Sequence, residues 1–256
     1  MTKRFRSITN KLPALIAGAV LLLVWQLVCS LNLVPAYMLP SPLRVVQALW
    51  SDRAVLWGHT LITLEEALAG LGLGVALGFA FALFMDAFPL LRRAVYPILV
   101  VTQTVPTVAI APLLVLWLGY DLTPKIVLIV LTTFFPVTVG LLDGFSSADP
   151  DAVALLRSMG AGKWQIFRYI KFPGALSQFF SGLRIATAYC VVGAVISEWL
   201  GGFAGLGVYM TRVRKAFAFD KMFAVILLIS VISLLLMALV DVLRRVCMPW
   251  QKESSN

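Results

Sequence analysis

Six apolar runs, each long enough to cross a lipid bilayer, constrain this chain more than any other feature. They make the 256-residue sequence 61% hydrophobic and only 13% charged, whereas soluble domains are about half apolar and a quarter charged. A helical span needs about 20 apolar residues. We therefore predict an all-α polytopic membrane protein that forms a single transmembrane domain over residues 1–256. The six predicted spans cover residues 13–31, 60–86, 93–118, 124–145, 177–200 and 221–246.

Basic residues between the apolar runs predict the orientation of the chain. The formal net charge is +9, and the charges gather beside the spans, which is typical of a topology signal rather than of a nucleic-acid-binding face. The N-terminal cluster from Lys3 to Lys11, the stretch after the fourth span and the pair Arg244 and Arg245 all favour cytoplasmic termini. The cluster from Arg212 to Lys221 opposes this assignment. The majority predicts N-in and C-in, with no nucleic-acid partner.

The segment between the first two spans contains three prolines and a short amphipathic pattern. Ser41 followed by Pro42 is typical of a helix N-cap and first turn. We predict a short interfacial helix over Pro42–Trp50, with one apolar face.

The longest water-compatible stretch, residues 146–176, follows the fourth span and is predicted to be a cytoplasmic docking surface. Asp149 or Asp151 is placed to cap a short helix that ends near Met159. A glycine hinge follows, and a second amphipathic helix is predicted over Lys163–Phe172, where Pro173 ends it or opens the fifth span.

Prolines lie inside the third and fourth spans. A proline removes a backbone donor and clashes with the preceding turn, which a bilayer tolerates only where the freed groups face protein or a wet cavity. Transporter pathways are built in this way, and a packing kink is the alternative. The predicted pathway residues are Gln103, Thr104, Pro106, Thr107, Pro112, Pro136 and Glu198, the last lying before a glycine-rich turn.

Three glycines recur at four-residue spacing in the second span. Gly70, Gly74 and Gly78 share one helix face, and small residues at this spacing let helix backbones approach closely in lipid. The partner helix lies either within the same subunit or in another subunit.

Residues for catalysis are scarce. His59 is the one histidine and is interpreted as a surface residue at a membrane boundary, and the three cysteines lack metal-ligand spacing. The sequence MGAGKW resembles a phosphate-binding loop, but Arg157 replaces the leading glycine and Trp164 the hydroxyl residue. We expect no enzyme activity, metal or cofactor in this chain. Uphill transport then needs a partner ATPase or an ion gradient, and acidic residues confined to span ends weaken the alternative of an ATP-independent carrier or channel.

Five motifs in order resemble bacterial ABC-importer permeases. The pattern G-x9-I-x-[LF]-P resembles their cytoplasmic "EAA" loop. The runs LPSPLRVVQALW, QTVPTVAIAPLLVLWLG, FFPVTVGLLDG and LRIATAY…SEWLGGFAGLG are similar to those of the nitrate/sulfonate/taurine permease family. One departure is that Ala154, Leu155 and Leu156 stand where the E-A-A triplet falls, so the glutamate is absent.

This resemblance implies a type I importer permease of the bacterial inner membrane. By resemblance, two copies form a dimer around one path, two cytoplasmic ATPase subunits bind ATP and Mg, and a periplasmic or lipid-anchored solute-binding protein delivers cargo. The runs EWLGGFAGLG and VYMTRVRKAFAFDKMFA look more like the hydroxymethylpyrimidine (thiamine-precursor) branch than like the sulfonate, taurine or nitrate branches.

The resemblance also assigns ATPase coupling to the stretch after the fourth span. Lys163, Arg168 and Lys171 either pair with acidic ATPase residues or act only as topology signals. The predicted coupling residues are Asp151, Arg157, Gly160, Ala161, Gly162, Lys163, Trp164, Phe167, Arg168, Ile170 and Pro173.

Overall fold

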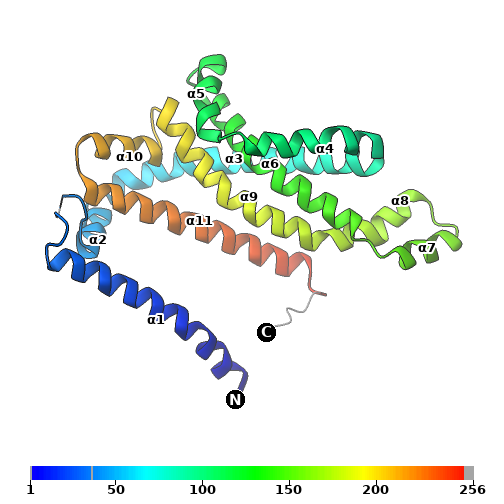
Figure 1. Ribbon diagram of the computed structural model, residues 1–256, viewed down its shortest axis with the longest axis horizontal. Helices are drawn as coiled ribbons and strands as arrows, with labels where there is room; N and C mark the ends of the chain where they lie inside the picture. The colour runs from blue at the N-terminus through cyan, green and yellow to red at the C-terminus, as the bar shows by residue number, and fades with distance from the viewer. Residues whose placement is uncertain (1, 36, 251–256) are drawn as a thin grey trace. The chain divides into compact units, whose positions relative to one another are not determined.

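The computed structural model describes residues 2–35 and 37–250, and over these residues it contains helices and no strand (Figure 1). This confirms the predicted all-α class. The side chains of residues 1–11, which carry the N-terminal basic cluster used to predict orientation, lie outside the described part. The helices are α1 (Thr2–Ser30), α2 (Pro42–Ser51), α3 (Arg53–Ala87), α4 (Pro89–Thr104), α5 (Thr107–Leu118), α6 (Leu122–Ser146), α7 (Pro150–Ser158), α8 (Lys163–Ile166), a π-helical turn (Phe167–Lys171), α9 (Phe172–Gly201), α10 (Leu206–Lys215) and α11 (Phe219–Cys247).

Four helical stretches in the described residues are long and apolar enough to cross a membrane. They are Arg53–Ala87, Leu122–Ser146, Lys163–Gly201 and Phe219–Cys247. The pair α4 and α5 makes a fifth if it counts as one broken span, and the apolar part of α1, Ile16–Ser30, is shorter than the other candidates. The chain is therefore a multi-pass membrane protein, while the count of six spans and the N-in/C-in orientation stay predictions.

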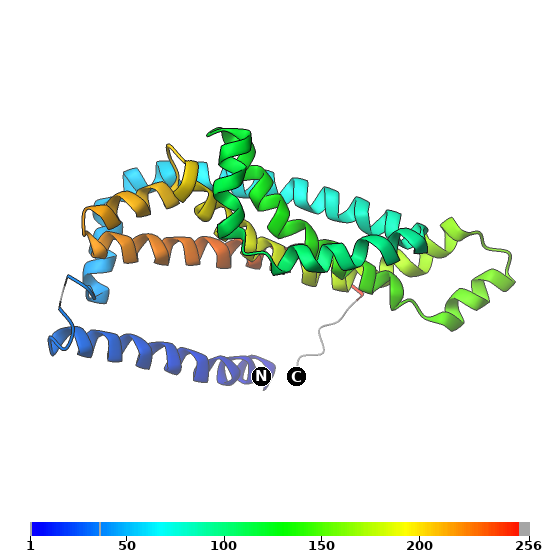
Figure 2. The same ribbon diagram turned by 45° about the horizontal axis from the view of Figure 1, so that its top comes forward.

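The third predicted span is broken where Pro106 predicts it. Helix α4 ends at Thr104, α5 begins at Thr107, and the two meet at 99° (Figure 2). The other two prolines do not interrupt their helices, since α5 continues through Pro112 and α6 through Pro136. At Pro136, Gly182 of α9 packs against the proline carbonyl.

The helices group into two compact units, residues 1–58 with 209–228, and residues 59–208 with 229–256. In the first unit, Trp25 Nε1 donates to the Pro40 carbonyl at 3.1 Å and its ring contacts Phe223. The predicted short helix is confirmed as α2, and Ser41 Oγ caps it by accepting from the Arg44 amide at 3.4 Å. The prediction of a single domain over the whole chain stays a prediction.

The second unit is built on close contacts between helix backbones. A Cβ added to Gly140 in α6 would lie 2.7 Å from the Gln178 carbonyl of α9, and one added to Gly144 would lie 2.6 Å from Ala175. Large side chains then fill the core at the end of α6, where Phe145 is 1% exposed. Helices α6 and α9 therefore pack with almost no side-chain layer between their glycine faces.

The glycine face of the second predicted span packs on the same block. Gly70, Gly74 and Gly78 of α3 lie against Ile129, Thr133 and Phe134 of α6. The Thr138 hydroxyl also donates to the Gly78 carbonyl at 3.3 Å. Of the two partners left open by the sequence, the structure shows the one within the chain, so the second unit contains a block formed by α3, α6 and α9.

Candidate functional site

The predicted docking surface folds as two short helices that project beyond the ends of α6 and α9 (Figure 1). We call residues 149–173 the coupling segment. Asp149 caps α7 by accepting from the Asp151 amide at 3.0 Å, as predicted. Gly160 has a φ of +84°, a left-handed conformation that costs glycine little and other residues more. The predicted glycine hinge between the two helices is therefore present.

Most of the coupling segment is open to its surroundings. No residue of α7 is buried, and Met159 and Trp164 are 73% and 70% exposed. Ala161, Phe167, Ile170 and Pro173 are half-buried, whereas the other predicted coupling residues are exposed, namely Asp151, Arg157, Gly160, Gly162, Lys163, Trp164 and Arg168. A protruding segment with exposed apolar and basic side chains has the character of a protein-binding surface.

Of the two roles left open for Pro173, the structure shows the second, since Pro173 opens the helix of the fifth predicted span, and the preceding helix does not stop at Phe172. Helix α8 passes through a π-helical turn into α9, and Pro173 lies in the first turn of α9. The π-turn brings Phe167 to 5.3 Å from the Phe145 ring, while Trp164 stacks on Phe167 at 5.7 Å. Phe167 thus anchors the segment to α6, and Trp164 is left on the outside.

Lys171 also turns inward, although the sequence placed it among residues that face an ATPase or signal topology. Its Nζ donates to Asp86 Oδ1 at 2.7 Å and to Oδ2 at 2.9 Å. Asp86 lies at the end of α3, and both side chains are at least two-thirds buried. Lys171 therefore has a partner within its own chain, whereas Lys163 and Arg168 are exposed.

The predicted pathway residues fall in two places. Gln103, Thr104, Pro106 and Pro112 are exposed around the break between α4 and α5, and Thr107 there is half-buried. Thr104 Oγ1 donates to the Val101 carbonyl at 2.8 Å, so this threonine binds its own helix. Pro136 lies in the packed interface between α6 and α9, and Glu198 is 1% exposed in a network near the other end of α3.

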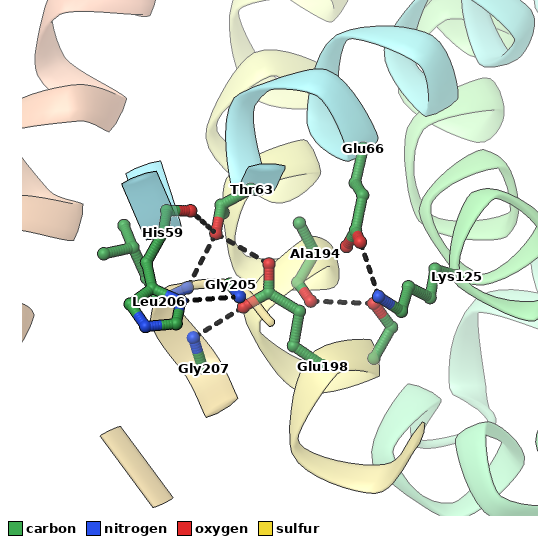
Figure 3. A network of polar contacts seen from close by, with 10 residues as sticks. His59, Thr63, Glu66, Lys125, Ala194, Glu198, Gly205, Leu206 and Gly207 are labelled. Carbon is green, nitrogen blue, oxygen red and sulfur yellow. Dashed lines mark hydrogen bonds and ion pairs between the residues drawn. The ribbon is translucent and has the colours of Figure 1, made fainter. Parts of the chain in front are cut away.

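That network, shown in Figure 3, ties α3 to α9 and to the turn that follows α9. Thr63 of α3 donates its hydroxyl proton to Glu198 Oε1 at 2.6 Å and accepts from the Leu206 amide at 2.8 Å. The second oxygen of Glu198 accepts from the Gly207 amide at 2.5 Å. The backbone can come this close because Gly205 has a φ of +120° and no Cβ, which would collide with the Glu198 carboxylate.

A buried ion pair lies beside these hydrogen bonds. Lys125 Nζ of α6 is 2.5 Å from Glu66 Oε1, with the residues 8% and 2% exposed. Glu65, one residue earlier, points outward and is exposed. His59 was interpreted as a surface residue, and this is wrong: it is half-buried, and its Nδ1 accepts from the Gly205 amide at 3.0 Å. We call Thr63, Glu66, Lys125 and Glu198, with the turn 205–207, the α3 network.

Sequence reasoning missed most of the α3 network. The contacts that join α3 to the rest of the network link residues 59 to 143 positions apart in sequence, so no local pattern connects these elements. The signals that were present are the glycines of the turn, which allow a close backbone approach, and the carboxylates toward the ends of apolar runs, which need a partner if they are buried in a membrane. Within the described residues, no group of three or more His, Cys, Asp or Glu could hold a metal ion.

Taken together, these features define a polytopic helical protein with a broken span, a glycine-packed block and a protruding segment. The family described as binding-protein-dependent transport system inner membrane component matches residues 72–247. The chain belongs to this family and is a permease subunit of ABC-importer type.

Curated relatives agree with this assignment over nearly the whole chain. A probable ABC transporter permease protein of Haemophilus influenzae is 40% identical and covers 90% of this chain and 93% of its own length. The formylaminopyrimidine transport permease protein ThiX of Halalkalibacterium halodurans is 37% identical, with coverage of 91% and 93%. The taurine transport system permease protein TauC of Escherichia coli is 32% identical, with coverage of 92% and 88%. The predicted resemblance to the nitrate/sulfonate/taurine family is confirmed.

The fold has a counterpart among solved structures. A chain from the crystal structure of an amino acid ABC transporter with histidines superposes with a TM-score of 0.65 at 17% identity, covering 78% of this chain and 97% of that one. This likeness confirms the type I importer permease fold.

Proposed function

We propose that this chain forms the translocation path of an ATP-driven importer in a bacterial cytoplasmic membrane. Its cargo in this proposal is a small pyrimidine of the thiamine-precursor class, with sulfonates, taurine or nitrate as the next candidates. The partners are two ATPase subunits that bind ATP and Mg, a second copy of this chain, and a periplasmic or lipid-anchored solute-binding protein.

The exposed coupling segment is the observation that carries this proposal. A permease without a nucleotide site has to receive work from a partner, and the segment exposes the large side chains of Trp164 and Met159. Large exposed side chains at the tip of a rigid element are typical anchors of protein interfaces. In the proposed N-in orientation, this tip faces the cytoplasm and the α3 network faces the outside.

The proposed cargo class rests on the relatives. The relative named for formylaminopyrimidine is 37% identical to this chain, whereas the relative named for taurine is 32% identical at similar coverage. The glycine-rich turn of the α3 network lies in the part of the sequence that resembles the pyrimidine branch most.

Reconstitution of the complete transporter tests the proposal. The chain is expected to purify with an ATPase subunit and to support uptake of hydroxymethylpyrimidine in proteoliposomes only when ATP and the binding protein are supplied. Uptake by the chain alone, driven by an ion gradient, would instead identify a carrier. Calorimetric titration of the cognate binding protein separates the cargo question, since binding of taurine without binding of pyrimidines would overturn the proposed cargo but not the importer.

The exposed tip has its own test. Trp164→Ala is expected to weaken co-purification of the ATPase, because it removes the largest exposed anchor of the segment. Tyr169→Ala is a matched control, since Tyr169 is an equally exposed aromatic residue (66%) that lies in the π-turn and not in α8. Equal retention of the ATPase by both variants would show that Trp164 is no anchor.

A further inference from the structure

Helix α3 and the coupling segment are far apart in sequence but in contact in the fold. Asp86 at the end of α3 and Lys171 of the coupling segment are 85 residues apart and form an ion pair. Their ion pair uses both carboxylate oxygens, at 2.7 and 2.9 Å, and is partly shielded from solvent. A charge-assisted contact of this kind is about twice as strong as a neutral hydrogen bond. It therefore holds the end of α3 to the last residue of the π-turn.

A row of packed rings runs parallel to the ion pair. The exposed Trp164 stacks on Phe167, the Phe167 ring lies 6.0 Å from Phe172, and Phe172 meets Phe79 of α3 edge-on at 6.2 Å. Displacement of the tip at Trp164 is thus passed to α3 by side chains in contact. The π-turn is the point of this path where the helix departs from regular hydrogen bonding, as π-turns at functional sites often do.

The far end of α3 carries Thr63 and Glu66 of the α3 network. Between Thr63 and Asp86 the helix is continuous, which at a rise of about 1.5 Å per residue makes a rod of roughly 35 Å. Its glycine face is seated on α6, so the rod has little freedom to bend away from that helix. Movement imposed at Asp86 therefore reaches the hydrogen bonds that hold the turn 205–207.

We infer that Asp86 and Lys171 are positioning residues for transport, which make α3 follow the coupling segment and so link it to the α3 network. This inference rests on the proposed function, because it assigns α3 a part in transmitting the work of the ATPase. Neither residue touches solute in this assignment. They act by making α3 move together with the coupling segment.

The test uses the assembled transporter and substitutions that remove one charge each. Asp86→Asn and Lys171→Gln are expected to keep ATPase co-purification and basal ATP hydrolysis. Stimulation of hydrolysis by the loaded binding protein and solute uptake per ATP are expected to fall about tenfold, within the usual range of coupling between sites. The exchange Asp86→Lys with Lys171→Asp is expected to restore part of the loss, because it re-forms the pair with reversed charges.

A matched control comes from a second ion pair in the same unit. Arg184 Nε and Asp241 Oδ1 are 3.7 Å apart, with side chains 53% and 40% exposed. Asp241→Asn is expected to change coupling by no more than about twofold, because exposed pairs contribute little. If Asp241→Asn uncouples as strongly as Asp86→Asn, the assignment to α3 is wrong.

A double substitution separates transmission from mere stability. Thr63→Val at the far end of α3 is expected to lower uptake per ATP by itself. Combining it with Lys171→Gln should do no more harm than the worse single change, because both break one route. If the fold-losses of uptake per ATP multiply in the double variant, the two residues act independently, which would overturn the inference.

The remaining outcomes decide between the two proposals. Wild-type coupling in Asp86→Asn and Lys171→Gln overturns the inference and leaves the importer assignment intact. Loss of ATPase association in these variants without rescue by the exchange shows a purely structural pair, which also overturns it. Failure of the unsubstituted chain to purify with an ATPase contradicts the proposed function itself.

Discussion

The side chains near the two ends of α3 differ in exposure: those of the coupling segment are exposed, whereas those of the α3 network are buried. At the coupling segment, Trp164 is 70% exposed and the basic side chains of Lys163 and Arg168 point away from the fold. In the α3 network, Glu66, Lys125 and Glu198 are each less than 9% exposed and are bound by one another or by backbone amides. One end offers its contacts to a partner, whereas the other uses them within the chain.

This difference teaches which end depends on assembly. Removing water from an ion pair costs several kcal/mol per ion, and the cost is recovered only when partners are well placed. In the α3 network, Lys125 and Glu198 find partners within the chain, and so does one oxygen of Glu66, while its second oxygen, Oε2, is buried without a hydrogen bond. The exposed side chains of the coupling segment have not been removed from water, so they gain only when another protein covers them. Substitutions at the two ends are therefore expected to show their effects in different measurements.

The largest effect on folding is expected from Lys125→Met. The change leaves the Glu66 carboxylate buried without its cation, and loss of one partner of a buried pair costs about 3–5 kcal/mol. Unfolding in nanodiscs, followed by tryptophan fluorescence, measures this loss. Glu66→Leu with Lys125→Met removes both charges and is expected to recover most of the stability.

The control for this experiment is the exposed pair of Arg184 and Asp241. Arg184→Met is expected to cost less than about 1 kcal/mol, as measured exposed pairs do. Equal losses for Lys125→Met and Arg184→Met would mean that burial does not set the two pairs apart. The contrast between the ends of α3 would then lose its energetic basis.

A smaller loss of folding stability is expected from a substitution at the interface between α6 and α9. Gly182→Ala places a Cβ against the backbone carbonyl of Pro136, which has no free rotation to escape it. Forcing an extra carbon into such an interface costs roughly 1–3 kcal/mol. Gly174→Ala in the same helix meets nothing within 4 Å, and is expected to stabilise α9 by a few tenths up to about 1 kcal/mol. If Gly182→Ala is as harmless, α6 and α9 do not pack as tightly as described.

Much of the fold follows from local sequence signals. Apolar runs predict the long helices, Ser41 and Asp149 predict two helix starts, and Pro106 predicts the broken span, because each acts within one or two turns. Pro112 lies inside α5 without interrupting it, so a proline in an apolar run does not by itself show where a helix ends.

The candidate site divides in the same way. The glycine hinge and the exposed Trp164 follow from the pattern of the coupling segment. The partners Asp86 for Lys171 and Glu198 for Thr63 do not, because they join helices 85 and 135 residues apart. Which charged side chain turns inward depends on helix rotation by a fraction of a turn, as the buried Glu66 and the exposed Glu65 show.

At the exposed end, Gly160→Val is expected to act on coupling more than on folding. A β-branched residue at a φ of +84° is strained by about 1–2 kcal/mol, and the segment relieves this strain by changing the angle between α7 and α8. Membrane insertion and thermal stability should stay near wild type while ATPase co-purification and uptake fall. Gly160→Asn is the matched control, because asparagine tolerates the left-handed conformation. Equal uptake by both variants would show that the hinge angle is irrelevant.

The smallest effect is expected from a third polar contact, in the first unit, whose titrating groups Asp52 and Tyr209 lie outside the candidate spans. Burial by itself would raise the pKa of Asp52, but hydrogen bonds from Lys221, Tyr209 and Ser51 outweigh it and hold the pKa below its ordinary 3.8. Burial, together with the hydrogen bond to Asp52, raises the pKa of Tyr209 above its ordinary 10. Because the pKa of the Asp52 carboxyl is lower in the folded chain than in the unfolded chain, the ionised carboxylate stabilises the fold at pH values above the unfolded pKa. This stabilisation is lost as the pH falls through the folded pKa. The raised pKa of the Tyr209 phenol means that its protonated form stabilises the fold below about pH 10.

The contact should therefore be constant between about pH 5 and 9 and weaken only outside that range. Hydrogen exchange of the α2 amides compares the chain with Asp52→Asn, which removes the carboxylate that Lys221 and Tyr209 share. The difference is expected to be level across neutral pH and to shrink below about pH 4, where the carboxyl of the unsubstituted chain takes up its proton. Asp121→Asn, an exposed change in the other unit, should leave α2 exchange unaltered at every pH. A difference that changes steeply near pH 6 to 7 would mean that a group other than Asp52 or Tyr209 stabilises α2. The Asp52 contact would then not rank, by burial, between the exposed coupling segment and the buried α3 network.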